Sequence, residues 1–314
     1  MTLTSGTTTH TYRTLDVPVA GGMLRVGVWD PSSSDVATSG APTVLAVHGI
    51  TASHRAWPAV VAALPGVRVI APDLRGRGRS NGLPGPHGMA AHADDLAAVI
   101  ELVGGVPVVA LGHSMGGFVA TVLAHRRPDL VSRLVLVDGG IPLPAPVGLP
   151  DDASADDVLH ALLGPAAERL SRTFPDREAY RTFWRAHPAF ADAWSPELTD
   201  YVDYDLVDGP DGLHPASSYP AVAADSLDLY EGGPLLDAVA GPAPVGVPTT
   251  FLRAPRGLLD AEPLYDPAWL AAWAARLPHV SMRDVADVNH YTIIMSPPGV
   301  RAVAAATHTA LTQV

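Results

Sequence analysis

Short apolar runs alternate along the chain with longer segments whose apolar positions recur every three or four residues. Runs of about five residues rich in Val, Ile and Leu are typical of buried strands, and the longer period is typical of amphipathic helices. This pattern predicts strands at His10–Val17, Met23–Trp29, Thr43–Val47, Val67–Ala71, Val106–Ala110, Ser132–Val137, Pro248–Arg253 and Val280–Val285. Strands and helices in alternation predict an α/β protein.

The helical segments carry recognisable ends. Ser53 and Asp266 are good N-cap residues, and Pro128 ends a helix that follows the fifth strand. The expected helices are Ser53–Leu64, Met89–Val103, Val119–Arg127, Asp266–Leu277 and a last one from Pro297 or Pro298 to about Leu311. We interpret Asp94 and Asp95 as the solvated face of the second of these helices.

The alternation is interrupted once. Prolines break any regular element after Ile141, and residues 151–240 are acidic, helix-prone and contain several aromatic side chains. We therefore expect an α/β core in residues 1–140 and 246–314, with a helical cap inserted at 141–245. Aromatic residues expected to line a pocket beneath the cap are Trp184, Phe190, Trp194, Tyr201, Tyr204 and, outside the cap, Tyr291.

Composition narrows the class of protein. The 314 residues are 47% hydrophobic, which supports a sizeable core, yet no run of about 18 uncharged apolar residues is present. The first 14 residues are polar and show no secretory signal. The absence of cysteine fits a reducing compartment, and the net charge of −12 argues against a nucleic-acid surface. We expect a cytoplasmic protein whose partner is a small molecule, not nucleic acid or membrane, and we leave a homo-oligomer open.

A candidate nucleophile lies between the fifth strand and the helix that follows. The sequence Gly112-His113-Ser114-Met115-Gly116 has the G-x-S-x-G pattern of a nucleophile elbow. Gly112 and Gly116 suit positions where a Cβ would collide with neighbouring backbone. The turn would expose the Ser114 hydroxyl and aim the N–H of Met115 at a developing oxyanion.

A second oxyanion donor is expected after the third strand. His48-Gly49-Ile50-Thr51 follows that strand at the carboxyl edge of the sheet, where ligands bind in open α/β folds. The backbone N–H of Ile50 is the candidate. We expect His48 and His113 to shape this region, because both lie beside glycines of the motifs.

A serine hydroxyl needs a base, and the base needs an orienting acid. His290 follows the last strand, at the same edge of the sheet as Ser114, and lies C-terminal to it as the order Ser, acid, His requires. Asp138, at the tip of the sixth strand, is favoured as the acid. Asp260, in a long loop after the seventh strand, is the alternative, and Asp287 is a weaker third choice.

These motifs resemble the α/β-hydrolase fold serine hydrolases over nearly the whole chain. The matching features are the His48-Gly49 loop, the Asp73–Ser80 loop, the elbow and a histidine after the last strand. The Asp73–Ser80 loop lacks the phosphate-loop pattern, and we expect Arg and Asp pairs to hold it. The resemblance implies an eight-stranded, mostly parallel sheet with an antiparallel first hairpin, flanked by helices, with the cap inserted after strand 6.

The resemblance also assigns roles. It implies Ser114 as nucleophile, His290 as base, and the N–H groups of Met115 and Ile50 as oxyanion donors. Most members carry the acid after the seventh strand, where this chain has Arg256-Gly257. A subset that includes haloalkane dehalogenases and zearalenone-type lactone hydrolases carries it after the sixth, which matches Asp138. The dehalogenases use an aspartate nucleophile, so serine excludes their chemistry.

The expected function is hydrolysis of a small apolar carboxylic ester or lactone through an acyl-enzyme, without metal or organic cofactor. A bulky lactone such as zearalenone is the most specific form of this prediction. The alternatives are an acyltransferase, a C–C hydrolase or a cofactor-free peroxidase of the same fold, or a non-catalytic protein that binds a small ligand.

Overall fold

The computed structural model describes residues 10–32, 40–103, 107–144, 152–163, 165–230, 233–242 and 244–313. The first residue of the strand expected at Val106–Ala110 lies outside this part of the chain. In the described part, no helix is long and apolar enough to cross a membrane.

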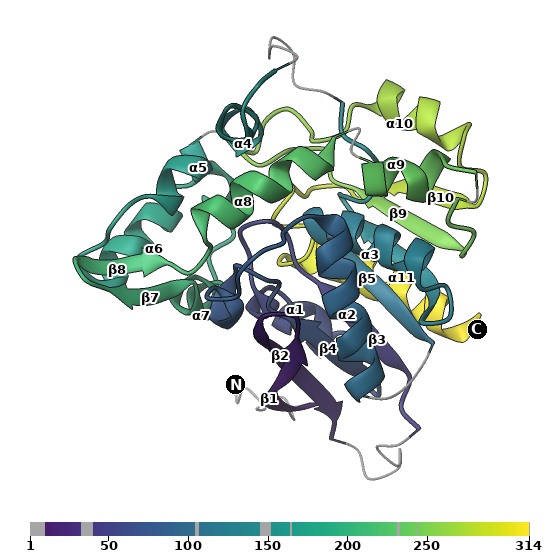
Figure 1. Ribbon diagram of the computed structural model, residues 1–314, viewed down its shortest axis with the longest axis horizontal. Helices are drawn as coiled ribbons and strands as arrows, with labels where there is room; N and C mark the ends of the chain where they lie inside the picture. Colours follow the sequence, from purple (N-terminus) through teal and green to yellow (C-terminus); the bar gives the residue numbers. More distant parts are fainter. Residues whose placement is uncertain are drawn as a thin grey trace, which may run out of the picture.

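A single eight-stranded sheet forms the centre of the molecule (Figure 1). Its strand β2 runs antiparallel to both neighbours, and all the other pairs are parallel. This confirms the expected mostly parallel sheet with an antiparallel first hairpin. In order across the sheet the strands are β1 (His10–Val19), β2 (Gly22–Pro31), β4 (Arg68–Pro72), β3 (Thr43–Val47), β5 (Val108–His113), β6 (Val131–Val137), β9 (Thr249–Arg253) and β10 (Val280–Asp284).

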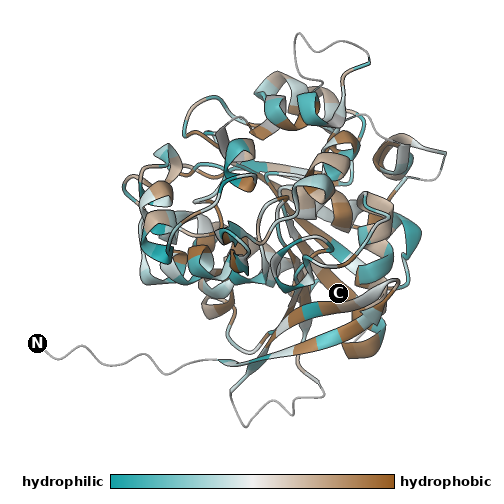
Figure 2. Ribbon diagram, turned by 60° about the vertical axis from the view of Figure 1, so that its left-hand side comes forward, coloured by the Kyte–Doolittle hydropathy of each residue, from teal (hydrophilic) through white to brown (hydrophobic). Residues whose placement is uncertain are grey.

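Helices cover both faces of the sheet, because its strands are apolar on both sides. In β3, Leu45 and Val47 belong to one hydrophobic cluster, whereas Val44 and Ala46 belong to the other. Figure 2 shows the hydrophobic residues gathered along the central strands. The first cluster packs against α2 (Met89–Val103), α3 (Met115–Arg126) and α10 (Pro267–Ala274), and the second against α1 (Pro58–Ala62) and α11 (Pro297–Thr312).

Two helix boundaries differ from the expected ones for identifiable reasons. The helix expected at Ser53–Leu64 is divided into a 3₁₀ turn at His54–Ala56 and α1, because Pro58 lacks an N–H and cannot continue a helix. Ser53 does cap the first piece, accepting a hydrogen bond from the N–H of Arg55. The helix α3 begins four residues before Val119, directly at the elbow.

The described elements between β6 and β9 make up the region that we call the cap, and α5, α6, β7 and β8 lie to the left in Figure 1. We expected it to be helical, but it also contains an antiparallel hairpin. The turn sequence Gly209-Pro210-Asp211-Gly212 explains the hairpin, since Gly and Pro favour tight turns. The cap elements are α4 (Ala155–Leu163), α5 (Pro165–Leu170), α6 (Arg177–Arg185), a 3₁₀ turn (Pro188–Phe190), α7 (Pro196–Tyr204), β7 (Leu206–Gly209), β8 (Gly212–Pro215), α8 (Tyr219–Ser226), a 3₁₀ turn η4 (Leu227–Leu229) and α9 (Gly233–Ala240).

Buried ion pairs hold the loop after β4, as the sequence predicts. The guanidinium of Arg75 makes two hydrogen bonds of 3.0 and 2.8 Å to Asp95. The solvated role expected for Asp95 is therefore wrong: its side chain is only 6% exposed because it pairs with this arginine. Arg77 pairs with Asp225 of α8, which also accepts a bond of 2.9 Å from His92. The contacts of Arg77 and His92 with Asp225 connect the cap to the core.

Candidate active site

Ser114 occupies a strained turn between β5 and α3. Its φ of 53° lies in the left-handed region, which costs a non-glycine residue free energy. The N–H of Ser114 donates to the carbonyl of Val137 at 2.9 Å, which ties the turn to β6. A Cβ at Gly112 or Gly116 would clash with backbone atoms of the turn and of β3. The local sequence therefore suits the sharp turn that the G-x-S-x-G pattern predicts.

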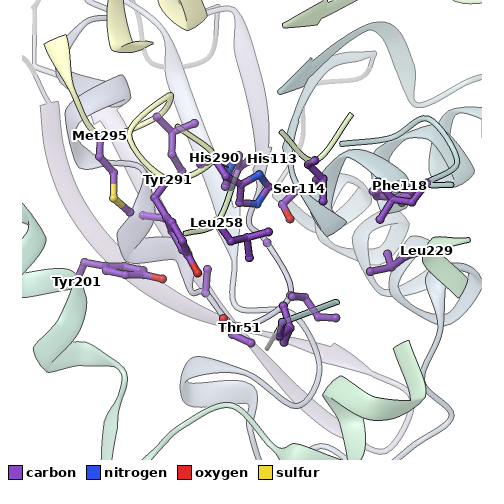
Figure 3. A pocket seen from close by; sticks show the side chains of 18 residues that line it. Thr51, His113, Ser114, Phe118, Tyr201, Leu229, Leu258, His290, Tyr291 and Met295 are labelled. Carbon is purple, nitrogen blue, oxygen red and sulfur yellow. Dashed lines mark hydrogen bonds between the residues drawn. The ribbon is translucent and has the colours of Figure 1, made fainter. Parts of the chain in front are cut away.

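The structure brings His290 and Asp138 together. Nδ1 of His290 donates to Oδ2 of Asp138 at 2.7 Å, and both side chains are buried. The other carboxylate oxygen, Oδ1, accepts the N–H of Ala254 at 3.1 Å. His290 and Ser114 line the same pocket (Figure 3). Within the described residues no hydrogen bond joins the Ser114 hydroxyl to His290, and such contacts often tighten only when substrate binds.

The other two candidate acids lie elsewhere. Oδ1 of Asp260 accepts the amide of Asn289 at 2.9 Å and lies 3.2 Å from Nε of Arg256. Asp287 is exposed, in a turn with a φ of 62°. Neither has a hydrogen bond to His290 among the interactions of the described residues. Of the three candidate acids, only Asp138 has a hydrogen bond to His290 among the described residues.

Asn289, which the sequence analysis missed, holds the loop that carries His290. Its amide donates to the carbonyl of Ala189 in the cap at 3.0 Å. Its Oδ1 accepts the N–H groups of Tyr291 and Thr292 at 3.0 and 2.9 Å. An asparagine that bonds the backbone two residues ahead is a recognised turn signal, and it could have marked this residue.

His113 connects the elbow to the same loop. Because the carbonyl of His290 can only accept, Nε2 of His113 donates to it, at 2.8 Å. Burial lowers the pKa of His113 well below its usual value, so the ring is neutral at physiological pH. His113 thus acts as the shaping residue that the sequence predicts.

The loop that carries Ile50 passes directly over Ser114. A Cβ built on Gly49 would lie 3.1 Å from the Cβ of Ser114, which is closer than such atoms usually approach. In the part of the chain that the structure describes, no hydrogen bond uses the N–H of Ile50 or of Met115. Met115 is the first residue of α3, whose first N–H groups have no partner inside the helix. Both N–H groups are therefore available beside Ser114.

His48 fixes the direction of the Ile50 N–H. Its Nε2 must accept the N–H of Leu74, at 2.9 Å, so Nδ1 carries the proton and donates to the Gly49 carbonyl at 2.8 Å. In a trans peptide the next N–H points opposite to that carbonyl. Nε of Arg77 donates to the carbonyl of Ile50 at 2.8 Å. The peptide groups on both sides of Ile50 are thus held by buried side chains.

Stability should depend on pH through His48. Burial lowers its pKa to about 4, although the nearby Asp73 carboxylate partly opposes this shift. The folded state thus binds this proton less well than the unfolded chain. The contribution of neutral His48 to the free energy of unfolding is therefore complete above pH 6.5. It is lost as pH falls toward 4, which lowers the free energy of unfolding by about 3 kcal/mol. Urea unfolding at pH 7.5, 6 and 4.5 measures it.

The control for that measurement is His48→Gln. The glutamine amide can accept from Leu74 and donate to Gly49 without titrating. The free energy of unfolding of this variant should fall less between pH 6.5 and 4 than that of the original chain. Equal falls in the two proteins would contradict the role of His48. The carboxylate of Asp73, whose pKa is lowered to about 2, titrates below this window.

The pocket above Ser114 has a volume of about 620 Å³, its open mouth included. Tyr201 and Tyr291 line it, but Trp184 and Trp194 do not, so the prediction is wrong for these two. Trp184 is 2% exposed and packs inside the cap, with its ring 5.5 Å from that of Phe190. The indole N–H of Trp194 donates to the Thr199 hydroxyl at 3.0 Å.

Two further residues expected to line the pocket, Phe190 and Tyr204, do not line it. The Tyr204 hydroxyl donates to Asp73 at 2.7 Å instead of entering the pocket. Aliphatic residues from loops line much of the pocket, and the sequence did not indicate them because they belong to no motif. They include Leu143, Leu258, Leu264 and Met295. Among the described residues no group of three or more His, Asp or Glu side chains is placed to hold a metal ion.

Comparisons with known proteins agree with this architecture. A family model described as alpha/beta hydrolase fold matches residues 42–179. The chain is 36% identical over 228 residues to "Lipase LipV" of Mycobacterium tuberculosis, covering 72% of this chain and 77% of that protein. The chain belongs to the α/β-hydrolase fold family.

A further relative and two solved structures of the same fold extend the comparison. This α/β hydrolase is 37% identical over 124 residues to the "Bifunctional esterase/perhydrolase DCH" of Acinetobacter calcoaceticus, covering 37% of this chain and 45% of that protein. The crystal structure of E-2-(acetamidomethylene)succinate hydrolase superposes with a TM-score of 0.75 at 21% identity, over 95% of this chain and 98% of the other. A thermophilic esterase from Thermogutta terrifontis gives a TM-score of 0.64 at 25% identity, over 96% and 98%.

Proposed function

We propose that this α/β hydrolase is a serine hydrolase that cleaves carboxylic esters through an acyl-enzyme. The observation that carries the proposal is the buried hydrogen bond of 2.7 Å between His290 and Asp138, in a pocket shared with Ser114. Since a carboxylate only accepts, Nδ1 of His290 carries the ring proton, and Nε2 is left to act as a base.

The reaction follows from these assignments. Nε2 of His290 takes the hydroxyl proton while Oγ of Ser114 forms a bond to the ester carbonyl carbon. The carbonyl oxygen becomes negative and accepts hydrogen bonds from the N–H groups of Met115 and Ile50. Collapse of this intermediate breaks the bond to the leaving alcohol, which receives the proton from His290. Water then repeats the steps on the acyl-enzyme and releases the acid.

The relatives support an ester as substrate, because one is named as a lipase and another as an esterase/perhydrolase. The lactone is the narrower part of the proposal, with a macrocyclic lactone such as zearalenone as its most specific form. That part depends only on the position of Asp138 after the sixth strand. Simple p-nitrophenyl esters are therefore the first substrates to test, with lactones beside them.

Labelling with a fluorophosphonate tests the proposal, because the reagent captures an activated serine. We expect one adduct per chain, on the peptide that contains Ser114, and loss of p-nitrophenyl ester turnover in step with labelling. Turnover in the presence of a competing alcohol separates hydrolysis from acyl transfer by the products formed. A chain that neither reacts with the reagent nor turns over any ester would be a binding protein, and the proposal would be abandoned.

A further inference from the structure

The pocket beside Ser114 has two chemically different ends. On one side of Ser114 in Figure 3 lie Phe118 and Leu229, and this end is apolar. On the side of His290 lie Tyr201, Tyr291 and Thr51, each of which carries a hydroxyl group. In Figure 3 the two phenol oxygens and the Thr51 side chain are turned toward the same part of the pocket.

The hydroxyl groups at this end differ from those of the other buried tyrosines. The hydroxyls of Tyr180, Tyr204 and Tyr265 bond to Asp205, Asp73 and the Ile141 carbonyl, respectively. Within the described residues the hydroxyls of Tyr201 and Tyr291 have no such partner, and both residues line the open pocket. A ligand oxygen in the pocket can therefore pair with each of these hydroxyls and gain affinity.

Both tyrosine rings are packed in the second hydrophobic cluster. The ring of Tyr291 lies 5.1 Å from that of Phe190 and 5.7 Å from that of His290. Burial raises the pKa of both Tyr201 and Tyr291, so each keeps its proton at physiological pH. The two phenols are therefore neutral groups that can both donate and accept hydrogen bonds.

The hydroxyl-bearing end of the pocket lies on the side of His290, and this position determines which part of a substrate contacts it. In ester cleavage His290 delivers its proton to the oxygen of the leaving alcohol, so that alcohol lies on the side of His290. The acyl group then extends over Phe118 and Leu229. Because no arginine or lysine lines the pocket among the described residues, a carboxylate there would be buried without a cation.

We infer that Tyr201, Tyr291 and Thr51 form a recognition site for an uncharged oxygen on the leaving alcohol. The preferred substrates are esters of an apolar acid with a hydroxylated alcohol of the glycol or glycerol type. This inference rests on the proposed function and adds to it the chemical class of the alcohol. It assigns Tyr201 and Tyr291 as specificity-determining residues.

Three esters that share one acid test the inference: 2-hydroxyethyl, propyl and carboxymethyl butanoate. The first two differ only by a hydroxyl in place of a methyl group. The quantity to compare is the ratio of kcat/KM for hydroxyethyl over propyl ester. We expect Tyr201→Phe and Tyr291→Phe each to lower this ratio by about 3- to 10-fold, because each removes a hydroxyl that pairs with the hydroxyethyl oxygen. When the ratio is compared between variants, the different intrinsic reactivities of the two esters cancel.

Tyr230→Phe is the matched control, since Tyr230 lies in the cap but does not line this pocket. It should leave the ratio unchanged. An unchanged ratio in the Tyr201 and Tyr291 variants, equal losses on the two esters, or a preference for the carboxymethyl ester would each overturn the inference. If p-nitrophenyl esters are still hydrolysed in that case, the proposed function stands and only the alcohol assignment fails.

Discussion

Replacing Ser114 with alanine is expected to lower kcat for p-nitrophenyl ester hydrolysis by about a millionfold, to the level set by binding and the oxyanion donors alone. The substitution removes only the nucleophilic oxygen. Among the described residues the Ser114 hydroxyl makes no hydrogen bond, so the thermal midpoint should stay close to that of the original chain. Stopped assays at high enzyme concentration, together with thermal unfolding, measure both quantities.

The controls separate catalysis from general damage. Ser217→Ala removes a buried cap hydroxyl that also has no hydrogen-bond partner, and it should keep full activity. His290→Ala should match Ser114→Ala, and the double variant should lose no more than either, since the two side chains act as one unit. Substantial activity in Ser114→Ala would assign the chemistry to another group.

The fold was predictable because its signals are local. The strand β3 and the helix α2 have the boundaries that hydrophobic runs alone indicate. Contacts between distant segments leave no such local signal. Asp95 follows the pattern of an exposed helix face, yet it is buried by an arginine 20 positions earlier in the chain. No periodicity within a helix records such a partner.

The sequence predicts the candidate catalytic residues, but not most of the residues that line the pocket. Ser114, Asp138 and His290 each follow a strand, and parallel strands carry such residues to one edge of the sheet. No comparable rule predicts which residues line the pocket. Trp184 has the expected chemistry, but it serves the core of the cap, whereas leucines from unremarkable loops reach the pocket. Which side of a cap helix faces the sheet depends on packing that the sequence does not display.

The cap and the oxyanion loop are connected through one arginine. Arg77 is fully buried, donates to the carbonyl of Ile50 at 2.8 Å, and lies 3.8 Å from the sulfur of Met115. It also pairs with Asp225 of the cap helix α8. The residues proposed as oxyanion donors therefore share a neighbour that the cap holds in place. A cap that changes position would alter the support of both donors.

Asp138→Asn is expected to lower kcat by about 10⁴-fold, and its hydrogen bonds explain why. The N–H of Ala254 requires an oxygen, so the asparagine carbonyl should remain there and its NH₂ group should face His290. Nδ1 of His290 would then have to accept, which moves the ring proton to Nε2. In that tautomer the ring presents a donor to Ser114 and cannot remove its proton. Steady-state kinetics with a p-nitrophenyl ester measure the loss.

Asp260→Asn is the matched control, because it makes the same change of charge in the rival acid. An asparagine oxygen at this position can still accept the amide of Asn289, so kcat should change by less than about threefold. The two variants together discriminate between the acids: the large loss belongs to whichever residue orients His290. A loss of 10⁴-fold in Asp260→Asn with an active Asp138→Asn would mean that the loop after β9 rearranges to supply the acid, contrary to the geometry of this site.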